Sequence, residues 1–253
     1  LINIEQDDKV KAFICTQDLK DEDYVNGNYV IMATKMGQVK KTSLEQYSRP
    51  RSNGINAITV KDGDELLEAK LTNGNSQIML AVKSGKAIRF EENKTRPMGR
   101  NASGVRGIRL KDNKDEVVGM ISVNDMDANI LVVSENGYGK RSSLEDYRLT
   151  NRGGKGVKTI SITEKTGKLV TLKSVSDSDD LMIINKSGIA IRMEVEDLRV
   201  MGRATQGVKV ISLKDGDSIA AVAKVMKNDD DIEDINDIEF TGCLLYTSDA
   251  ADE

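Results

Sequence analysis

One pattern occurs four times along this chain of 253 residues, with a period of about 50 residues. Each copy is anchored on a glycine that follows a short apolar run, and the four anchors are Gly37, Gly85, Gly137 and Gly188. Repeats of this length are units that bury their apolar faces only against neighbouring units. The period therefore limits the fold to an array of similar modules.

Each copy also contains short segments with the alternating apolar pattern of β-strands. A second glycine follows each anchor by 17 to 19 residues and opens the segments GINAITV, GVRGIRL, GVKTISI and GVKVISL. Turn-forming residues come next, followed by the apolar segments 65–72, 116–123, 168–175 and 218–225. Residues 9–16 show the same pattern ahead of the first copy. Since no window keeps helical spacing over three turns, the sequence predicts an all-β, propeller-like array of four-stranded blades.

The repeat sets the expected domain limits. We expect one partial array over residues 1–227, in which residues 1–8 close an upstream blade, so that at least one blade precedes the chain. The units are expected at about 9–61, 62–112, 113–164 and 165–217, with a closing strand at 218–226. Residues 228–240 read as an acidic tail. The last residues, 241–253, break with the preceding composition, resemble translated library-adapter sequence and are excluded from fold reasoning.

Charge is divided unevenly along the chain. The formal net charge is −4, but ten of the 41 acidic residues lie within residues 228–253, which contain no lysine or arginine. Residues 1–227 thus combine 37 basic with 31 acidic groups and carry a net charge of +6. A basic body favours a polyanionic partner. The acidic stretch 229–239 is either a solvated tail or an intramolecular competitor for the basic surface.

Composition argues against a catalytic or metal centre in this chain. There is no histidine, and Cys15 and Cys243 lie at opposite ends without a CxxC pair, which removes His-based triads and most zinc sites. We expect Cys15 to be a reduced, partly packed thiol. Tyr47 and Tyr147 occupy the same place in two copies, and we expect them to pack between blades. No apolar run approaches the roughly 18 residues of a membrane span and no signal pattern is present, so we expect a soluble, cytoplasmic protein.

Basic residues recur at equivalent places in the copies. Counted from the anchor glycine, the fourth position is basic in all four copies, and the eleventh and fifteenth are basic in the last three. Such recurrence favours a repeated ligand, and the phosphate backbone of duplex DNA is one. Surface charges that discourage edge pairing of strands are the alternative. The candidate DNA-binding residues are Lys40, Lys41, Arg49, Arg51, Arg89, Arg96, Arg100, Lys140, Arg141, Arg148, Arg152, Arg192, Arg199 and Arg203.

The most glycine-dense segment is a further candidate for phosphate contact. It comprises Arg152, Gly153, Gly154, Lys155 and Gly156. Glycines let backbone N–H groups approach an oxyanion closely, although the GxxxxGK[ST] spacing of a P-loop is absent. A simple loop between strands is the alternative. With 4% aromatic residues and no tryptophan, the chain favours duplex over single-stranded partners.

Several strings resemble the C-terminal domains of DNA gyrase A: NIEQDDKV (3–10), RPMGRNASGVRGIRL (96–110), GYGKRSSLEDY (137–147) and RVMGRATQGVKVISL (199–213). The resemblance covers roughly residues 1–227. It implies a six-bladed β-pinwheel whose blades exchange strands and whose basic rim wraps duplex DNA, with about four complete blades present here. Segment 152–156 is similar to part of the family's wrapping box but lacks its leading glutamine and first basic residue.

The same resemblance implies how the chain would work in a larger enzyme. It would be a non-catalytic part of an ATP-hydrolysing type II topoisomerase, in an A2B2 heterotetramer with gyrase B. ATP and Mg²⁺ would bind elsewhere, so no cofactor is expected here. Two other interpretations stay open at this point: the corresponding domain of topoisomerase IV, and a propeller that binds acidic proteins through its recurrent arginines.

Overall fold

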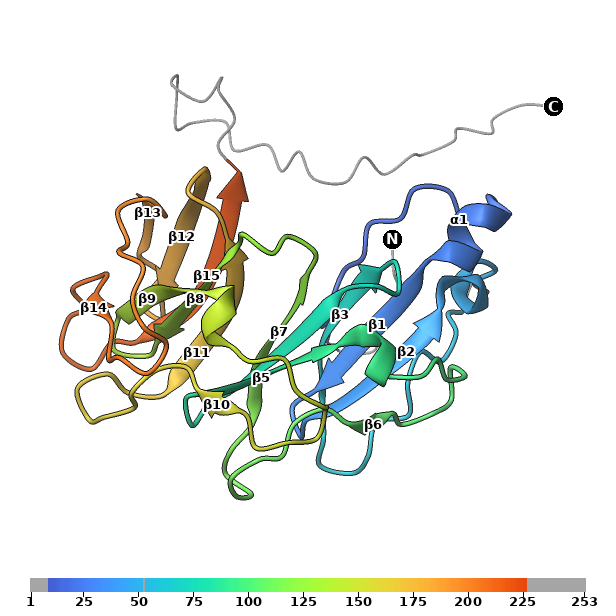
Figure 1. Ribbon diagram of the computed structural model, residues 1–253, viewed down its shortest axis with the longest axis horizontal. Helices are drawn as coiled ribbons and strands as arrows, with labels where there is room; N and C mark the ends of the chain where they lie inside the picture. Colours follow the sequence, from blue (N-terminus) through green and yellow to red (C-terminus); the bar gives the residue numbers. More distant parts are fainter. Residues whose placement is uncertain (1–8, 52, 227–253) are drawn as a thin grey trace.

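The computed structural model describes residues 9–51 and 53–226, and most of its regular structure is antiparallel β-sheet. Four sheets follow one another in a curved row (Figure 1). The first sheet contains β1 (Tyr29–Thr34), β2 (Gln38–Ser43), β3 (Leu66–Thr72) and β6 (Val105–Arg106). The second contains β4 (Gln77–Val82), β5 (Lys86–Glu91), β7 (Val117–Val123) and β10 (Val157–Lys158).

The other two sheets repeat the arrangement with one difference. The third contains β8 (Asn129–Ser134), β9 (Tyr138–Ser143), β11 (Leu169–Val175) and β14 (Val208–Lys209). The fourth contains β12 (Asp179–Asn185), β13 (Ala190–Glu194) and β15 (Ile219–Met226), and within the described residues it has three strands. The predicted all-β array of blades is thus confirmed. The predicted acidic tail and residues 1–8 and 241–253 lie outside the described residues.

Short helical segments accompany the sheets. An α-helix, α1 (Glu22–Gly27), precedes the first sheet and is capped by Asp21, whose side chain accepts from two backbone N–H groups. A 3-10 turn follows the second strand of each of the first three sheets. These turns are η1 (Leu44–Tyr47), η2 (Glu92–Lys94) and η3 (Leu144–Asp146).

The outer strand of each of the first three sheets comes from the following repeat. The sheet orders are β3-β1-β2-β6, β7-β4-β5-β10 and β11-β8-β9-β14, so β6, β10 and β14 cross from one blade to the previous one. We call the crossing segments arm 1 (96–108), arm 2 (148–160) and arm 3 (199–211). Only two residues of each arm pair as a strand, and residues 54–60 form none. The longer strands predicted after the second glycines were therefore wrong.

Close backbone contacts explain most of the repeated glycines, although Gly54 and Gly188 make none. Gly104 has a φ of +87°, and a Cβ there would lie 2.5 Å from the carbonyl oxygen of Val39 on β2. Gly37 faces the same arm, because a Cβ there would lie 2.9 Å from the carbonyl oxygen of Ile108. Side chains at either position would push the arm off the sheet. In the fourth sheet the equivalent anchor, Gly188, has nothing within 4 Å of the Cβ position.

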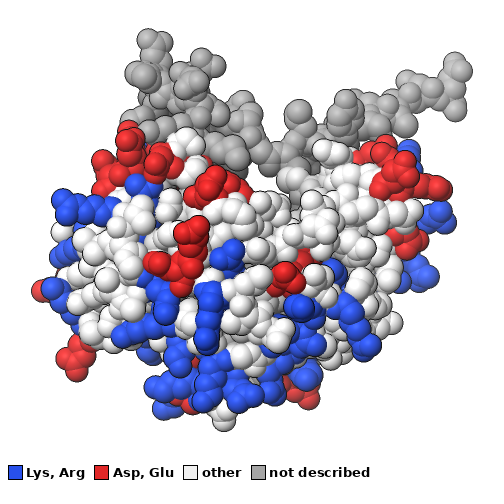
Figure 2. All heavy atoms as spheres, viewed as in Figure 1, with Lys and Arg blue, Asp and Glu red and all other residues white. Residues whose placement is uncertain are grey.

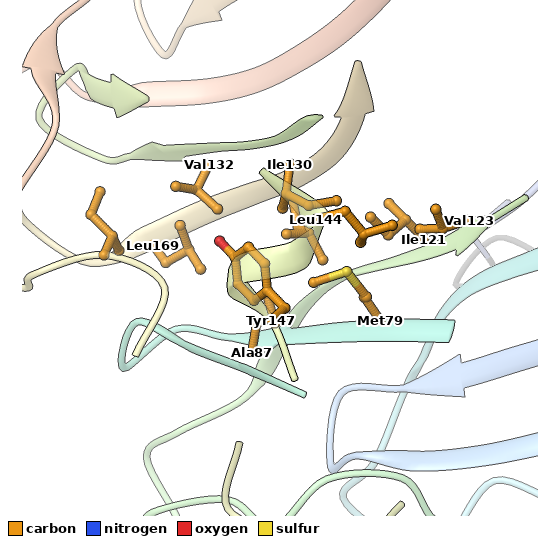
Figure 3. Packing of buried hydrophobic residues seen from close by; sticks show 12 residues of the cluster. Met79, Ala87, Ile121, Val123, Ile130, Val132, Leu144, Tyr147 and Leu169 are labelled. Carbon is orange, nitrogen blue, oxygen red and sulfur yellow. The ribbon is translucent and has the colours of Figure 1, made fainter. Parts of the chain in front are cut away.

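Apolar side chains fill the spaces between neighbouring sheets. Between the second and third sheets, Met79, Ile130 and Tyr147 belong to one buried cluster (Figure 3), which also takes up Ile160 of arm 2. Ile108 of arm 1 enters the corresponding cluster between the first and second sheets. Each of these arms thus anchors itself by an isoleucine in the core. Tyr147 is 1% exposed, so its predicted packing role is confirmed.

The segment before the first repeat differs from its prediction. Residues 9–16 form no strand, and Phe13 is 83% exposed. Ala12 and Ile14 pack against the apolar cluster of the first sheet. Cys15 is exposed, so the predicted partly packed thiol is wrong. Although apolar residues alternate here, residues 9–16 form an irregular segment. No neighbouring strand pairs with them in the described part of the chain, and only one side of the segment packs on the cluster.

Candidate nucleic-acid interface

The recurrent basic residues divide into an inward and an outward set. Lys40 and Lys140 are 0% exposed, Lys41 is 4% exposed and Arg141 is 6% exposed. A buried side chain cannot reach a phosphate group on the protein surface. The prediction that Lys40, Lys41, Lys140 and Arg141 contact DNA is therefore wrong for this structure, and their hydrogen bonds indicate another role.

The ammonium groups of Lys40 and Lys140 hold arms in place. Lys140 Nζ donates to the carbonyl oxygen of Gly202 at 2.6 Å. Lys40 Nζ donates to the carbonyl oxygen of Ala57 at 2.5 Å and to that of Arg100. Burial disfavours the charged form, and it lowers the pKa of both lysines from 10.5 to about 8. These two side chains are thus structural.

Arg89 connects the second and third blades. Its Nη1 donates to the carbonyl oxygens of Leu144 at 2.8 Å and Tyr147 at 3.0 Å, at the 3-10 turn of the next repeat. Its Nε donates to Gln77 Oε1 at 2.6 Å in its own sheet. The guanidinium is partly buried and makes an inter-blade contact, and contact of Arg89 with DNA stays a prediction.

The same position connects the other neighbouring blades. Arg141 on β9 donates to the carbonyl oxygen of Leu198 in the fourth repeat and pairs with Asp177. Lys41 on β2 lies 3.5 Å from the carboxylate of Glu92, and both side chains are buried. Each contact ties the second strand of one blade to the segment that begins the next arm. We call Lys41, Arg89 and Arg141 the clamp residues.

Arg192 occupies the clamp position of the fourth blade in a different environment. Its side chain is 42% exposed, and its Nε donates to Asp180 Oδ2 at 2.6 Å in the same sheet. The described residues contain no further repeat that could supply a 3-10 turn. Arg192 is thus accessible, and its contact with DNA stays a prediction.

The outward set lies on the arms and on the equivalent segment of the first repeat. Arginines at the eleventh position after the anchor are exposed at the starts of the arms. Lys155 of arm 2 is exposed as well. The outward set comprises Arg49, Arg51, Arg96, Arg148, Lys155 and Arg199, and their contact with DNA stays a prediction.

The arginines at the fifteenth position are half-buried, and two of them join neighbouring arms. Arg152 Nη1 donates to the carbonyl oxygen of Arg106 at 3.0 Å. Arg203 Nη1 donates to the carbonyl oxygen of Lys158 at 2.9 Å. Arg100, Arg152 and Arg203 are partly exposed, so they are accessible to a ligand as well.

Backbone hydrogen bonds join successive arms into one continuous feature, which we call the belt (arms 1 to 3). Gly153 N donates to Gly107 O at 2.5 Å, and Arg109 N donates to Gly154 O at 2.8 Å, which joins arms 1 and 2. Ser161 N, directly after arm 2, donates to Thr205 O of arm 3 at 3.0 Å, and Arg203 Nη1 of arm 3 donates to Lys158 O of arm 2. The belt therefore runs across the blades instead of along any one of them.

The belt carries a row of basic residues that sequence reasoning missed. Arg106, Lys158 and Lys209 lie on the outer strands β6, β10 and β14, and all three are exposed. Each stands two residues after the second glycine of its repeat. All three also stand at the twenty-first position after their anchor glycine, so extending the same count past the second glycine would have found them.

Charge is polarised across the molecule. Figure 2 shows lysine and arginine side chains gathered along the lower edge, the side on which Figure 1 places β6 and β10. Acidic side chains gather mainly on the upper edge in the same view. An extended polyanion is attracted to the lower edge and repelled by the upper one.

The glycine-dense segment owes its glycines partly to packing. Gly156 has a φ of +70°, and a Cβ there would lie 2.6 Å from the carbonyl oxygen of Ala87 on β5. Gly153 and Gly154 lie close to arm 1 and to Ile88. A small hollow beside the segment is lined by Arg89, Arg148, Thr150, Asn151 and Lys155, among others. Phosphate contact at Gly153, Gly154 and Gly156 stays a prediction.

Metal-binding and membrane-spanning features are both missing from the part of the chain that the structure describes. Over residues 9–51 and 53–226, no group of three or more His, Cys, Asp or Glu side chains could hold a metal ion. Across those same residues, no helix is long and apolar enough to cross a bilayer.

Exchanged outer strands and a basic belt define the class of the fold, and solved structures agree. The structure of the DNA gyrase A C-terminal domain matches with a TM-score of 0.77 and 26% identity, covering 89% of this chain and 73% of that one. The C-terminal domain of DNA topoisomerase IV matches with a TM-score of 0.75 and 26% identity, covering 79% and 62%. The molecule is therefore of the C-terminal domain type shared by these two topoisomerases.

Sequence comparison identifies the family. The model described as "DNA gyrase C-terminal domain, beta-propeller" matches residues 28–73, 77–124, 128–176 and 179–226. DNA gyrase A of Staphylococcus epidermidis is 42% identical over 97% of this chain and 29% of its own length. That of Staphylococcus aureus is 44% identical over 91% of this chain and 26% of its own length. The chain belongs to the DNA gyrase A C-terminal domain family, and it spans less than a third of these relatives.

Proposed function

We propose that this chain binds duplex DNA along the belt without reading its sequence, and bends it around the array. The observation that carries the proposal is the row formed by Arg106, Lys158 and Lys209. One exposed cation recurs on each of three successive outer strands, and the arms that carry them are hydrogen-bonded to each other. A row of cations in register with a repeating scaffold suits a ligand with regularly spaced negative charge.

The arms add cations on both sides of this row. Arg96, Arg148 and Arg199 stand at the arm starts, while Arg100, Arg152 and Arg203 stand near the arm-to-arm contacts. Arginine and lysine contacts to phosphate fix the position of a duplex and carry no base information. Each contact is weak when exposed, so binding depends on the number of contacts in register. Arg49, Arg51 and Arg192 extend the series at its two ends.

Within a longer gyrase A polypeptide, this binding would deliver DNA to other domains. We propose that the wrapped segment is presented to a cleavage site elsewhere in gyrase, where ATP-driven strand passage introduces negative supercoils. Gyrase B would complete an A2B2 enzyme in the cytoplasm, and ATP and Mg²⁺ would bind outside this chain. The role of the present chain is non-catalytic: it neutralises phosphates and fixes the DNA path.

The test is a salt titration of duplex binding by the 253-residue chain. Fluorescence anisotropy with duplexes of about 60 base pairs and unrelated sequences should give similar affinities. If seven to nine phosphates are neutralised, log K should fall against log salt with a slope of roughly −6 to −8. A flat salt response, or no binding at about 100 mM salt, would reject the proposal and favour a protein partner for the belt.

A further inference from the structure

Each repeat places an exposed apolar residue directly after an exposed arginine. The pairs are Arg49–Pro50, Arg96–Pro97, Arg148–Leu149 and Arg199–Val200, and all eight residues are exposed. The chain contains two prolines, and both stand at this position. Leu149 is 45% exposed and Val200 is 54% exposed. We call these four pairs the tips.

The tips of the three arms are held in a fixed orientation by the preceding blade. Pro97, Leu149 and Val200 form parallel bridges with the clamp residues Lys41, Arg89 and Arg141. The residue after each tip donates its N–H to the carbonyl of the same clamp residue, at 2.7, 2.9 and 2.8 Å. The clamp side chains of Arg89 and Arg141 bind carbonyls just before the tips. The clamp residues thus fix the direction in which the exposed tips point.

Exposure of one apolar side chain needs no explanation, but this recurrence does. Surface hydrophobic residues scattered singly are normal in soluble proteins. Here an apolar residue directly follows an exposed arginine in all four repeats, at the twelfth position after the anchor in the last three and at the thirteenth in the first, while the residue itself changes between proline, leucine and valine. The preceding residues Tyr147 and Leu198 are 1% and 3% exposed and already supply the core contact at these places. Packing within this chain therefore does not account for Leu149 and Val200.

We propose that the tips enter the minor groove of the bound duplex, with the apolar side chain against a base step and the arginine on an adjacent phosphate. This inference rests on the proposed DNA binding and assigns its bending contacts. A duplex curved around a protein turns its narrowed, strongly negative minor groove inward once per helical turn, which attracts arginine. Apolar wedges at such places partly unstack a base step and kink the duplex. The belt cations supply affinity, and the tips supply curvature.

The proposal separates bending from binding in an experiment on the 253-residue chain. The test variant combines Leu149→Asn with Val200→Thr, which keep size and remove apolar character. The control is Val10→Thr, the same substitution as at Val200, at a residue that is 48% exposed and lies outside the belt. A duplex of about 60 base pairs with fluorophores at both ends reports bending by energy transfer, and anisotropy reports affinity.

We expect the test variant to bind within about threefold of the wild-type affinity, since phosphate contacts dominate it. Its rise in energy transfer on binding should be at most about half of that of the wild type, because the wedges are lost. The Val10→Thr control should match the wild type. Equal bending by the test variant, equal loss in the control, or binding without bending by the wild type would overturn the inference. Failure of all proteins to bind duplex would instead reject the proposed function itself.

Discussion

The clamp residues and the exposed cations of the belt share chemistry and period, yet they do opposite things. Arg89 and Arg141 place their guanidinium groups on carbonyls of the next repeat, whereas Arg106 and Lys158 extend from the outermost strands. A periodic scaffold needs periodic contacts between its units as much as a periodic ligand does. Recurrence of arginine alone therefore does not distinguish contacts between blades from contacts with a ligand, whereas the exposure of each side chain does.

The two sets should also differ in energy. A buried cation that satisfies carbonyl groups leaves them unpaired when it is removed, which costs several kcal/mol. An exposed cation contributes about 0–1 kcal/mol to folding, because water screens it and replaces its contacts. Substitution in the first set should affect unfolding, and substitution in the second should affect DNA binding.

The largest effect is expected for Arg141→Met. The change removes the hydrogen bond to the Leu198 carbonyl and the pairing with Asp177 between the third and fourth blades. We expect the free energy of unfolding to fall by about 3 kcal/mol, measured by urea denaturation with circular dichroism. An unchanged urea midpoint would show that the clamp contact is dispensable.

The next effect is on affinity and is expected for Arg106→Ala combined with Lys158→Ala. Both side chains are exposed on outer strands, so loss of two phosphate contacts should weaken duplex binding about tenfold and reduce the salt slope by roughly 2. Stability should stay within about 0.5 kcal/mol of wild type. The matched control is Lys9→Ala with Lys20→Ala, also exposed and outside the belt. Equal loss of affinity in the control pair would remove the special role of the belt.

A smaller effect concerns pH and the buried lysines. Burial lowers the pKa of Lys140 to about 8 in the folded state, while the unfolded value is near 10.5. Between these values the unfolded chain binds more protons, so the free energy of unfolding should rise with pH from about 8. Above about pH 10 the raised pKa values of Tyr47 and Tyr147 act in the opposite direction.

Urea denaturation of the wild type and of Lys140→Met at pH 7 to 9.5 measures this contribution. Lys40 retains its own lowered pKa of about 8, so the variant should keep part of the rise and lose the rest. Superimposable pH dependence of the two proteins would mean that Lys140 is fully charged and hydrated in the folded state.

The smallest effect is expected for Arg192→Met, which probes the clamp position where no blade follows in the described residues. Arg192 is 42% exposed and pairs with Asp180 in its own sheet. We expect a change of less than about 1 kcal/mol in the free energy of unfolding, against about 3 kcal/mol for the same substitution at Arg141. A loss as large as that of Arg141→Met would show that the position matters through its own sheet and not through the neighbouring blade.

Much of the fold could be predicted from the sequence because the repeat is strong. The anchor glycines located the hairpins, and the apolar segments 65–72, 116–123, 168–175 and 218–225 correspond to β3, β7, β11 and β15. The identity of the outer strand came only from family resemblance. Residues 105–106, 157–158 and 208–209 pair for two positions each, which is too short for a periodicity signal.

The site was predicted less well, for a physical reason. Strand β2 is covered on both faces, so Lys40 and Lys41 are both buried although they are neighbours in sequence. The same holds for Lys140 and Arg141 on β9. When both faces of a strand are covered, the alternation of apolar and polar residues cannot tell which side chains point inward and which point outward. The arms are irregular, so Arg96, Arg148 and Arg199 were found by their spacing and not by any strand pattern.

The location of bound DNA is the central claim, and a lysine acetylation footprint tests it most directly. The chain would be acetylated briefly with and without saturating duplex, and each lysine would be quantified by mass spectrometry. We predict protection of Lys155, Lys158 and Lys209 on the belt, with Lys9 and Lys20 unchanged. Protection of Lys9 and Lys20 with continued reactivity of the three belt lysines would contradict the account.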